Sequence, residues 1–398
     1  MPSEKFARLV MVTADNNNKY YEMTYNGGSN FDVKYGRIKS TAQNCSYPIS
    51  KWQAKYNEKV NKGYVDVTHT VSTTVETTKD SKDSSTVLQK VEDAKVDLFL
   101  SLMKKYTDGL VAKTYTVKYD DVTQTQIDEA QSYINELQKI SKTDTVGINN
   151  YLLKLYMVIP RYMGNVRDHL LPNIDIAKTL QQEQDNLDAM ASQVAMYKKD
   201  DKPSKKVKKE SKTLLDLLGI NKMVASKPGK DVEYLVKQLT GRKIEAFFEL
   251  EKPKENTTFG EWLGKQKNKD TRILIHGTKC TSVIPILEQG LKIRPTGNYQ
   301  FSGKVYGDGN YFSEVCSKSL NYTGYDPDKV LLVYEVHTGN PFVYDGWYKG
   351  NSFTLCYKEL QKRGFDSTYV KAGGGLLNSE IIAYNEEQCR IKYIMWLK

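Results

Sequence analysis

Alternating hydrophobic and polar positions near the start of the chain predict a small β-rich unit. Three short stretches alternate in this way and are separated by Asn- and Gly-containing turns: RLVMV, KYYEMTY and FDVKYGRI. The period then becomes helical in SKWQAKYNEKVNKG, where Trp52, Tyr56 and Val60 share one face. Residues 6–69 are therefore expected to form short strands and one helix.

Between residues 88 and 200 the hydrophobic positions follow the helical period. VLQKVEDAKVDLFLSLMKKY predicts one amphipathic helix, and INNYLLKLYMVI predicts another that Pro160 ends. IDIAKTLQQEQDNLDAMASQVAMY predicts a further long helix. In TQTQIDEAQSYINELQKI one stripe collects the apolar residues Ile127, Ala130, Ile134 and Leu137. We expect this region to be entirely helical.

The remainder of the chain returns to a mixture of strands and helices. A short amphipathic helix, TSVIPILEQGL, contains Gly290 near its C-terminal end. The strand-like stretches are KIEAFFELEK, RILIHGT, KVLLVYEVHTG and SEIIAYNEEQCRIKYIMWL. The predicted fold class is multidomain α+β: a small β-rich domain, an all-α domain and a mixed α/β domain.

Two low-complexity stretches separate these regions. Residues 70–87 are rich in Ser, Thr, Lys and Asp and predict a flexible linker, because little in them could be buried. KKDDKPSKKVKKESK, at residues 198–212, is a basic break that is most simply a solvated loop. The predicted domains are residues 1–69, 88–200 and 201–398, with the linker at 70–87.

Composition and charge narrow the class of partner. The chain has 398 residues, 39% of them hydrophobic, and a formal net charge of +10. Such a charge favours a polyanionic partner, either nucleic acid or an anionic membrane. The five cysteines and four histidines are scattered without zinc-finger spacing, so no metal is expected. An odd number of cysteines, no signal peptide and no apolar run of membrane-spanning length predict an intracellular, soluble protein.

The stretch YGDGNYFSEVCSKSLNY, residues 306–322, contains the most distinctive chemistry. It lacks the G-x-x-x-x-G-K-[ST] of a phosphate loop and the third glycine of a dinucleotide-binding fingerprint. If the second half is helical, Ser319 and Tyr322 face the same way, and Tyr311 lies just before that helix. These three residues could form a pocket for a flat, polar ring, although tyrosines at this spacing are more often packing residues.

Two further stretches contribute polar groups at strand ends. LIHGT places His276 and Gly277 at the end of a strand, where a glycine lets its backbone approach a ligand. LLNSEIIAY places Glu380 at the start of an apolar strand, where a carboxylate is costly without a partner or a function. A structural histidine and a salt-bridged glutamate are the alternative interpretations.

Taken in this order, these stretches resemble the ADP-ribosyltransferase catalytic domain of the poly(ADP-ribose) polymerase (PARP) family. The family's His-Tyr-Glu triad corresponds to His276, Tyr311 and Glu380, and HGT, GDGNYF and SKSLNY match its motifs. LYMVIPRYMG and DNLDAMASQVA resemble the helical regulatory domain of the DNA-damage-responsive members. YGRI with KWQAKYNEKVNKGY resembles a WGR domain. This order is that of the short DNA-dependent members, which lack zinc fingers.

The resemblance implies cleavage of the nicotinamide–ribose bond of NAD+ through an oxocarbenium-like transition state. No cofactor or metal beyond NAD+ as substrate is implied. Glu380 would bind the nicotinamide ribose and orient the incoming hydroxyl, supported by Lys318. The other implied NAD+-binding residues are Gly277 and Ser319 at the nicotinamide amide, Tyr311 and Tyr322 on the two faces of its ring, and His276, Thr278 and Arg294 at the adenosine end.

In the WGR-like region the resemblance implies binding of DNA strand breaks, such as a 5′-phosphorylated nick or an end. Arg37 and the basic helix with Lys51, Lys55 and Lys59 would contact phosphates, which position DNA without reading its sequence. Tyr35 replaces the tryptophan that gives the domain its name, and it could still stack on an end sugar or base. The alternative role for Tyr35 and Arg37 is contact with neighbouring domains.

The family resemblance also implies product and regulation. The triad glutamate favours polymer over single ADP-ribose units, attached to Glu/Asp of the protein itself and of nearby proteins. The helical domain would shield the NAD+ site until DNA is bound, with residues 181–188 as the blocking face. DNA damage response, repair and a nuclear location follow from the DNA partner. The alternatives are a mono-ADP-ribosyltransferase, an inactive DNA-end-binding scaffold and a toxin-like transferase.

Overall fold

The computed structural model divides the chain into two compact units. The first comprises residues 1–86, 109–200 and 297–299, and the second comprises residues 87–108, 201–296 and 300–398. The structure describes residues 5–38, 40–68, 88–198, 212–294, 297, 299, 305–344, 357–373 and 376–398. The predicted linker at 70–87 and nearly all of the basic break at 198–212 lie outside these residues.

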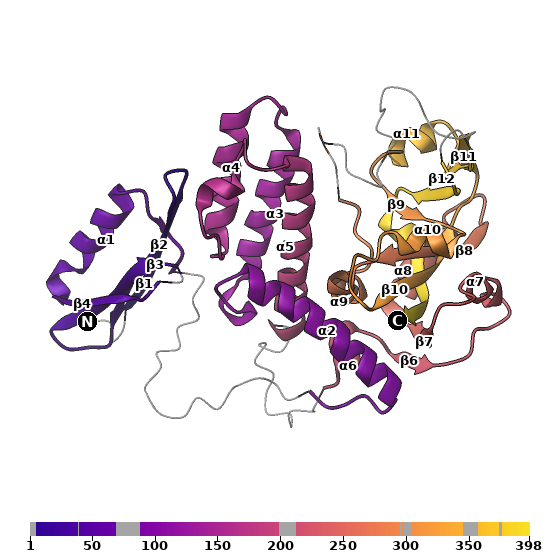
Figure 1. Cartoon of the computed structure of the whole chain (residues 1–398), viewed down its shortest axis with the longest axis horizontal. Helices are drawn as coiled ribbons and strands as arrows, with labels where there is room; N and C mark the ends of the chain where they lie inside the picture. Colours follow the sequence, from indigo (N-terminus) through magenta and orange to yellow (C-terminus); the bar gives the residue numbers. More distant parts are fainter. Residues whose placement is uncertain are drawn as a thin grey trace. The chain divides into compact units, whose positions relative to one another are not determined.

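The N-terminal part of the first unit is a five-stranded antiparallel sheet in the order β4-β3-β2-β1-β5 (Figure 1). Its strands are β1 (Lys5–Thr13), β2 (Asn17–Tyr25), β3 (Asn30–Arg37), β4 (Gln43–Pro48) and β5 (Val65–Asp66). Helix α1 (Trp52–Asn61) follows β4. The predicted β-rich N-terminal region is therefore confirmed.

The alternating pattern of these strands places apolar side chains on one face of the sheet. Leu9, Met23 and Phe31 are fully buried there, and the Trp52 ring of α1 lies 5.0 Å from the Phe31 ring. Further along α1, Val60 is exposed, so only the first part of the predicted apolar stripe packs against the sheet. Burial of this face is what holds the α1 helix on the strands.

Four long helices follow the N-terminal sheet along the chain: α2 (Ala94–Thr114), α3 (Gln124–Lys139), α4 (Thr145–Val158) and α5 (Ile176–Lys198). The predicted α3 stripe is confirmed, because Ile127, Ala130, Ile134 and Leu137 are all buried. Helix α2 starts later than predicted. The Asp93 carboxylate accepts hydrogen bonds from the amides of Lys95 and Val96, so it caps the helix and sets its first turn.

The second unit contains two sheets. The five-stranded sheet runs β6-β7-β14-β10-β8 and the four-stranded sheet runs β11-β12-β13-β9. The first consists of β6 (Lys222–Ala225), β7 (Ile244–Glu251), β14 (Cys389–Leu397), β10 (Lys329–His337) and β8 (Thr271–Thr278). The second consists of β11 (Pro341–Tyr344), β12 (Ser367–Val370), β13 (Glu380–Ala383) and β9 (Asn310–Phe312). The helices are α6 (Leu214–Leu218), α7 (Glu233–Lys237), α8 (Pro253–Gly264), α9 (Cys280–Gln289), α10 (Cys316–Leu320) and α11 (Tyr357–Lys362).

Two predicted elements of this unit differ in the structure. The apolar stretch after residue 378 forms two strands in different sheets, because Asn385 caps a 3-10 turn at Glu386–Gln388 that separates β13 from β14. The helix expected over SEVCSKSLNY, residues 313–322, is shorter in the structure: α10 ends at Leu320 and does not include Tyr322. The short helix near Gly290 is confirmed as α9, and Gly290 has the positive φ of +80° that favours glycine.

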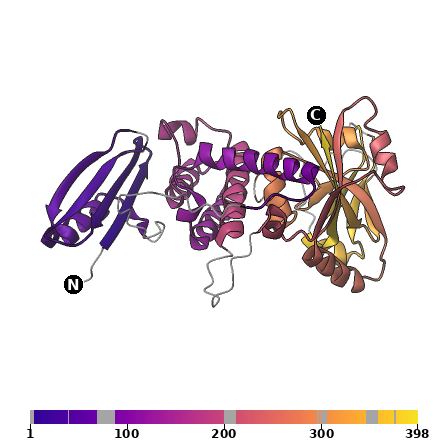
Figure 2. The same cartoon turned by 90° about the horizontal axis from the view of Figure 1, so that it is seen from below.

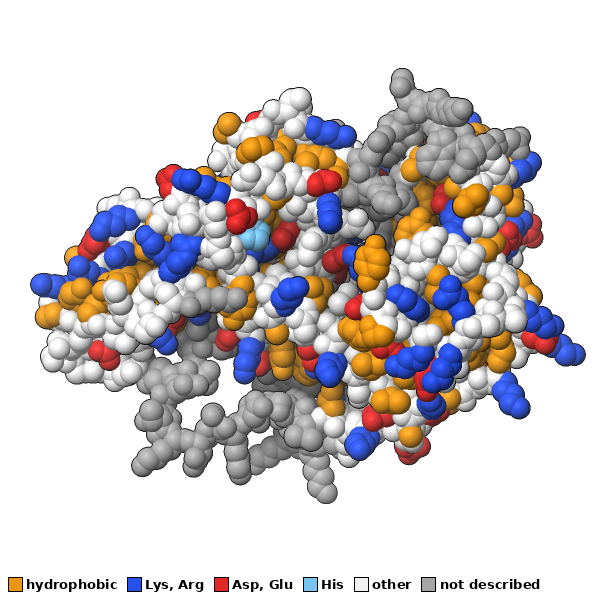
Figure 3. Space-filling view, in the orientation of Figure 1, with side chains coloured by type: hydrophobic (Ala, Val, Ile, Leu, Met, Phe, Trp, Pro, Cys, Tyr) orange, Lys and Arg blue, Asp and Glu red, His pale blue; other side chains and the backbone are white. Residues whose placement is uncertain are grey.

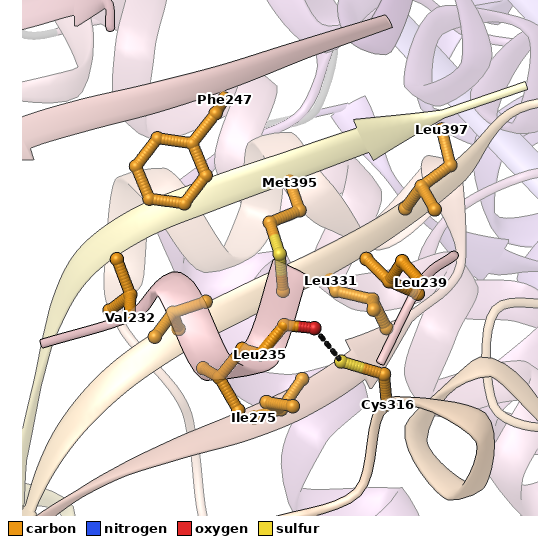
Figure 4. Close-up of a cluster of buried hydrophobic side chains, with 10 residues drawn as sticks. Val232, Leu235, Leu239, Phe247, Ile275, Cys316, Leu331, Met395 and Leu397 are labelled. Atoms are coloured by element: carbon orange, nitrogen blue, oxygen red, sulfur yellow. Dashed lines mark hydrogen bonds between the residues drawn. The ribbon is translucent and has the colours of Figure 1, made fainter. Parts of the chain in front are cut away.

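Backbone hydrogen bonds join the two sheets of the second unit. Ile275 of β8 and Ser313, directly after β9, exchange backbone hydrogen bonds of 2.9 and 3.0 Å. Beneath this junction lies a cluster of buried side chains that includes Leu235, Ile275, Cys316 and Leu331 (Figure 4). Strand β8, the end of β9 and helix α10 are thereby held on one buried cluster.

Helix α2, drawn in violet in Figure 2, belongs to both units. The boundary between the units falls between Asp108 and Gly109. Its first half is packed into the second unit. The Phe99 ring lies 4.9 Å from the Phe248 ring and 5.7 Å from the Trp396 ring, and the Tyr106 hydroxyl donates to Asp328 Oδ2 at 3.0 Å. These contacts make the first half of α2 an integral part of the second unit.

Candidate active site

His276 lies near the end of β8, and one hydrogen bond determines which of its ring nitrogens carries the proton. Its Nδ1 is 3.0 Å from the Tyr311 carbonyl oxygen, which can only accept a hydrogen bond. Nδ1 therefore carries the proton, and in the neutral ring Nε2 presents a lone pair. Burial lowers the pKa of His276 and outweighs the opposing effect of the Tyr311 carbonyl. The site thus presents a neutral imidazole that accepts a hydrogen bond.

Gly277 exposes its backbone on the unpaired side of β8. Ile275 directs its N–H and C=O away from β10 toward Ser313, and residues two apart in a strand direct these groups the same way. The N–H and C=O of Gly277 therefore also point away from β10. A Cβ at this position would lie 1.7 Å from the Ser319 carbonyl oxygen. Only glycine allows α10 to approach the strand this closely.

Helix α10 brings Ser319 and Lys318 to the same place. Ser319 is buried, and its Oγ donates to the Ile275 carbonyl at 3.3 Å. Lys318 Nζ lies 2.6 Å from Glu380 Oε1 and donates to the Asn378 carbonyl at 3.0 Å. Glu380, only 8% exposed at the start of β13, therefore has Lys318 as a fixed partner.

Two tyrosines lie near this carboxylate. Burial raises the pKa of Tyr311, and the Tyr384 hydroxyl and the Glu380 carboxylate contribute in the same direction. The Tyr311 hydroxyl donates to Gly307 O at 2.9 Å and accepts from the Tyr306 amide at 2.8 Å, so its ring is fixed. Partial burial and Glu380 likewise raise the pKa of Tyr322.

Tyr322 does not share a helical face with Ser319, as the sequence suggested. Helix α10 ends at Leu320, and Tyr322 follows in a turn closed by its amide on the Ser319 carbonyl at 3.1 Å. Ser319 is buried, whereas Tyr322 is 43% exposed. The Tyr322 ring is therefore held only in part by the protein and is accessible from solvent.

Thr278 and Arg294 occupy the neighbouring segments. Thr278 is buried at the end of β8, and its side chain shares a strand face with His276 because the two are two residues apart. Arg294 is half-buried and follows a segment anchored by Glu386, which accepts from the Ile293 amide at 2.9 Å. The adenosine-side role of both residues remains a prediction.

One glycine of the site escaped the sequence interpretation. A Cβ at Gly309 would lie 2.5 Å from Ile382 Cγ2 and 2.7 Å from the Ala383 carbonyl oxygen. Gly309 therefore lets the segment before β9 lie directly against β13, which carries Glu380. The signal was present in GDGNYF, but it indicates a close approach of two strands rather than a ligand-binding loop.

The structure places the predicted DNA-contact residues Tyr35 and Arg37 inside the first unit. The Tyr35 ring is half-buried 5.8 Å from the Tyr21 ring. Arg37 donates from Nη2 to Asn16 Oδ1 at 2.9 Å and to the Gly164 carbonyl in the segment after α4. Asn16 Oδ1 also accepts from the Val166 amide at 3.0 Å. Arg37 thus connects the sheet to the helices, as the alternative interpretation expected.

Lys51, directly before α1, and Lys55 and Lys59 within it differ in their side-chain contacts. Lys51 is exposed, whereas Lys55 Nζ lies 3.0 Å from Glu58 Oε2. Lys59 Nζ lies 4.4 Å from the centre of the Tyr21 ring, and burial lowers the pKa of Lys59. Figure 3 shows Lys and Arg side chains among hydrophobic ones over this part of the chain. Lys51 is therefore the most accessible of the three to a phosphate.

The described part of the chain contains neither a membrane-spanning helix nor a cluster of metal-binding side chains. No helix within it is long and apolar enough to cross a membrane. No group of three or more His, Cys, Asp or Glu side chains in the same residues could hold a metal ion.

Comparison with known proteins gives a family for this geometry. The model of the poly(ADP-ribose) polymerase catalytic domain matches residues 230–346, which include His276, Tyr311 and Ser319 and end before Glu380. The chain is 54% identical over 169 residues to "Putative poly [ADP-ribose] polymerase-like 100L" of Invertebrate iridescent virus 6, covering 42% of this chain and 92% of that protein.

Two other relatives match more weakly. "Uncharacterized protein 101L" of the same virus is 40% identical over 192 residues, which cover 48% of this chain and 78% of that protein. "Poly [ADP-ribose] polymerase 1" of Gallus gallus is 25% identical over 313 residues, which cover 69% of this chain and 30% of that protein. Together with the site geometry, these matches show that the chain belongs to the poly(ADP-ribose) polymerase family and is an enzyme, an NAD+ ADP-ribosyltransferase.

Proposed function

We propose that this enzyme is a DNA-break-activated poly(ADP-ribose) polymerase. It transfers ADP-ribose to Glu and Asp side chains of itself and of nearby proteins and releases nicotinamide. The observation that carries the catalytic part is the Glu380–Lys318 pair beside the Gly277–Ser319 contact. This arrangement puts a carboxylate next to backbone and hydroxyl groups suited to an amide.

The nicotinamide end of NAD+ would bind where β8 meets α10. The carboxamide is a donor and an acceptor, and the outward N–H and C=O of Gly277 complement both. The Ser319 hydroxyl, now on the Ile275 carbonyl, is within the same group of polar atoms. The fixed Tyr311 ring and the accessible Tyr322 ring would cover the two faces of the pyridinium, whose positive charge favours aromatic contacts.

Glu380 would then act on the ribose. A carboxylate that accepts hydrogen bonds from ribose hydroxyls raises the electron density of the sugar and favours the oxocarbenium-like transition state. Lys318 holds one carboxylate oxygen at 2.6 Å, which fixes the rotamer of Glu380 and leaves Oε2 to face the substrate. The same carboxylate would orient the attacking hydroxyl of the acceptor or of the growing chain.

His276 would hold the adenosine-side ribose through the Nε2 lone pair. We expect the KM for NAD+ to rise as the pH falls below about 6.5, because protonation of Nε2 removes that acceptor. Burial lowers the pKa of His276 in the folded protein, so its contribution to stability is complete above the unfolded pKa. That contribution is lost as the pH falls from there toward the folded pKa. The measurement is KM for NAD+ between about pH 5 and 8.

A His276→Asn variant keeps a donor for the Tyr311 carbonyl but cannot titrate, so this acid limb should disappear from its profile. His169→Asn, which alters a histidine bonded to the Met163 carbonyl in the first unit, should keep the limb. An unchanged acid limb in His276→Asn would assign the titration to another group.

Support for the DNA partner comes from the net charge of +10 and from the N-terminal sheet with its basic helix. In the proposal Lys51, Lys55 and Lys59 contact phosphates and Tyr35 stacks at the break. Arg37 then has a second function. Its bond to the Gly164 carbonyl ties the DNA-binding sheet to the segment that follows α4, so DNA bound at the sheet can influence the helices. A nuclear location follows from this partner.

The proposal includes shielding of the NAD+ site by the helices, with residues 181–188 of α5 as the blocking face. Glu183 is unsuited to this role, because it is buried in an ion pair with Arg161, beside the Tyr115 and Tyr156 rings. A blocking surface would therefore have to come from the exposed side chains of the same segment.

The experiment that tests activation measures NAD+ consumption with a duplex carrying a 5′-phosphorylated nick. We expect stimulation of about tenfold or more over the intact duplex, the range of ordinary allosteric coupling. Lys51→Glu should reduce the stimulation by adding repulsion at a phosphate-facing position.

A product ladder on a gel would identify polymer, and a single band would identify mono-ADP-ribose. Equal turnover with and without the nick would be consistent with transferase activity and would contradict activation by a DNA break.

A further inference from the structure

Helix α10 carries Lys318 and Ser319 but has no capping side chain of its own. It contains five residues, and its N-cap residue Val315 makes no side-chain cap hydrogen bond. A helix this short does not hold its own conformation, because nucleation costs more than so few hydrogen bonds return. The position of α10 must therefore be set by neighbouring segments.

Gln238 provides such a contact at the first turn of α10. Its side-chain Nε2 donates to the Glu314 carbonyl at 2.9 Å, and its Oε1 accepts from the Cys316 amide at 2.9 Å. The Cys316 amide is one of those that a helix leaves unpaired at its start. The Gln238 side chain thus caps α10 from a different part of the chain. Its amide nitrogen donates to the Glu314 carbonyl, and its amide oxygen accepts from the Cys316 amide.

The segment that carries Gln238 is itself firmly seated. Leu235 of α7 and Leu239 are buried in the same cluster as Cys316 (Figure 4). The Cys316 thiol donates to the Leu235 carbonyl at 3.3 Å. On the opposite side, the Tyr234 hydroxyl donates to the Ile273 carbonyl of β8 at 3.1 Å. Gln238 therefore connects the buried α7 segment to the first turn of a very short helix.

We infer that Gln238 is a positioning residue for NAD+ cleavage, acting through α10. Lys318 and Ser319 lie two and three residues after Cys316, within a single helical turn. A rotation of the first turn would move the ammonium away from Glu380 and the hydroxyl away from the Gly277 backbone together. This inference rests on the proposed function, in which Ser319 and Gly277 hold the nicotinamide.

Gln238→Ala removes both hydrogen bonds and leaves the buried leucines in place. We expect the KM for NAD+ to rise about fivefold, the equivalent of roughly one net hydrogen bond, with a smaller change in kcat. The matched control is Lys237→Ala, the exposed neighbour whose ammonium lies 3.2 Å from Glu233 Oε1. Lys237→Ala should leave KM unchanged.

Gln238→Glu separates positioning from a general loss of stability. The new carboxylate has the shape of the amide and still accepts from the Cys316 amide, but its second oxygen would face the Glu314 carbonyl as a second acceptor. Protonation restores a donor at that position. The ratio of kcat/KM between this variant and wild type should therefore increase as the pH falls from about 8 to about 5.5.

The outcomes distinguish the inference from its premise. If Ser319→Ala raises KM while both Gln238 variants match wild type, the positioning role of Gln238 is wrong and the nicotinamide site stands. If Ser319→Ala also matches wild type, the proposed site fails and the inference fails with it. Should Gln238→Ala not fold, the pH-dependent ratio of Gln238→Glu decides alone: a rise on acidification supports the inference, and a flat ratio overturns it.

Discussion

Glu380→Gln should lower kcat for NAD+ cleavage by about 10²–10³-fold, the usual effect of removing one group that stabilises developing charge. The amide has nearly the same shape as the carboxylate and still offers an oxygen to Lys318, which now lies 2.6 Å from Glu380 Oε1. Binding of NAD+ should therefore change much less than kcat. The measurement is kcat and KM from nicotinamide release, together with the Kd for NAD+.

A matched control separates the charge effect from a general effect of the substitution. Glu245 on β7 also pairs with lysines, Lys95 at 2.5 Å and Lys243 at 3.3 Å, but it is remote from the site in sequence and in the sheet order. Glu245→Gln should leave turnover unchanged. If Glu380→Gln kept turnover within about threefold of wild type, the carboxylate could not be the group that stabilises the transition state.

Gly277→Ala should reduce turnover by about 10²-fold and destabilise the protein by about 1–3 kcal/mol. The new Cβ would lie 1.7 Å from the Ser319 carbonyl oxygen, and that neighbour is backbone, which cannot rotate away. Helix α10 would have to move as a unit, carrying Ser319 and Lys318 out of place. Thermal unfolding and nicotinamide release measured on the same sample give both effects.

Gly260→Ala is the corresponding control. Gly260 lies inside helix α8, and a Cβ there meets no atom within 4 Å. Replacing a helical glycine in open space should stabilise the protein by up to about 1 kcal/mol and leave turnover unchanged. Normal turnover in Gly277→Ala would contradict the close packing of α10 on β8.

The candidate site was predictable where local pattern carries chemistry. His276, Gly277, Tyr311 and Glu380 each stand in a short motif, and the structure brings them into one unit of the fold. What those motifs could not supply is the contact between them. The His276–Tyr311 hydrogen bond uses a backbone carbonyl, and every residue has one, so no residue type marks it.

The remaining differences have the same origin in long-range contacts. Gln238 is an unremarkable surface residue in sequence, and its partner Cys316 is 78 positions away. Arg161 directly follows a helix-ending proline, and no pattern in LYMVIPRYMG marks it as buried, yet it is buried against Glu183. Hydrophobic periodicity reports which face of an element is buried, but not which distant segment covers it.

The second unit is assembled from separate segments of the chain, residues 87–108, 201–296 and 300–398. This separation determines when the unit can fold during synthesis. Synthesis from the N-terminus produces Phe99 long before Phe248 and Trp396. Until Phe248 and Trp396 have been made, the apolar face of the first half of α2 lacks the side chains that bury it in the folded protein. The N-terminal sheet, by contrast, pairs neighbouring strands and can fold as it emerges. The growing polypeptide therefore completes its transferase core only after Trp396 has been made, and the exposed helix is where a chaperone would be most useful.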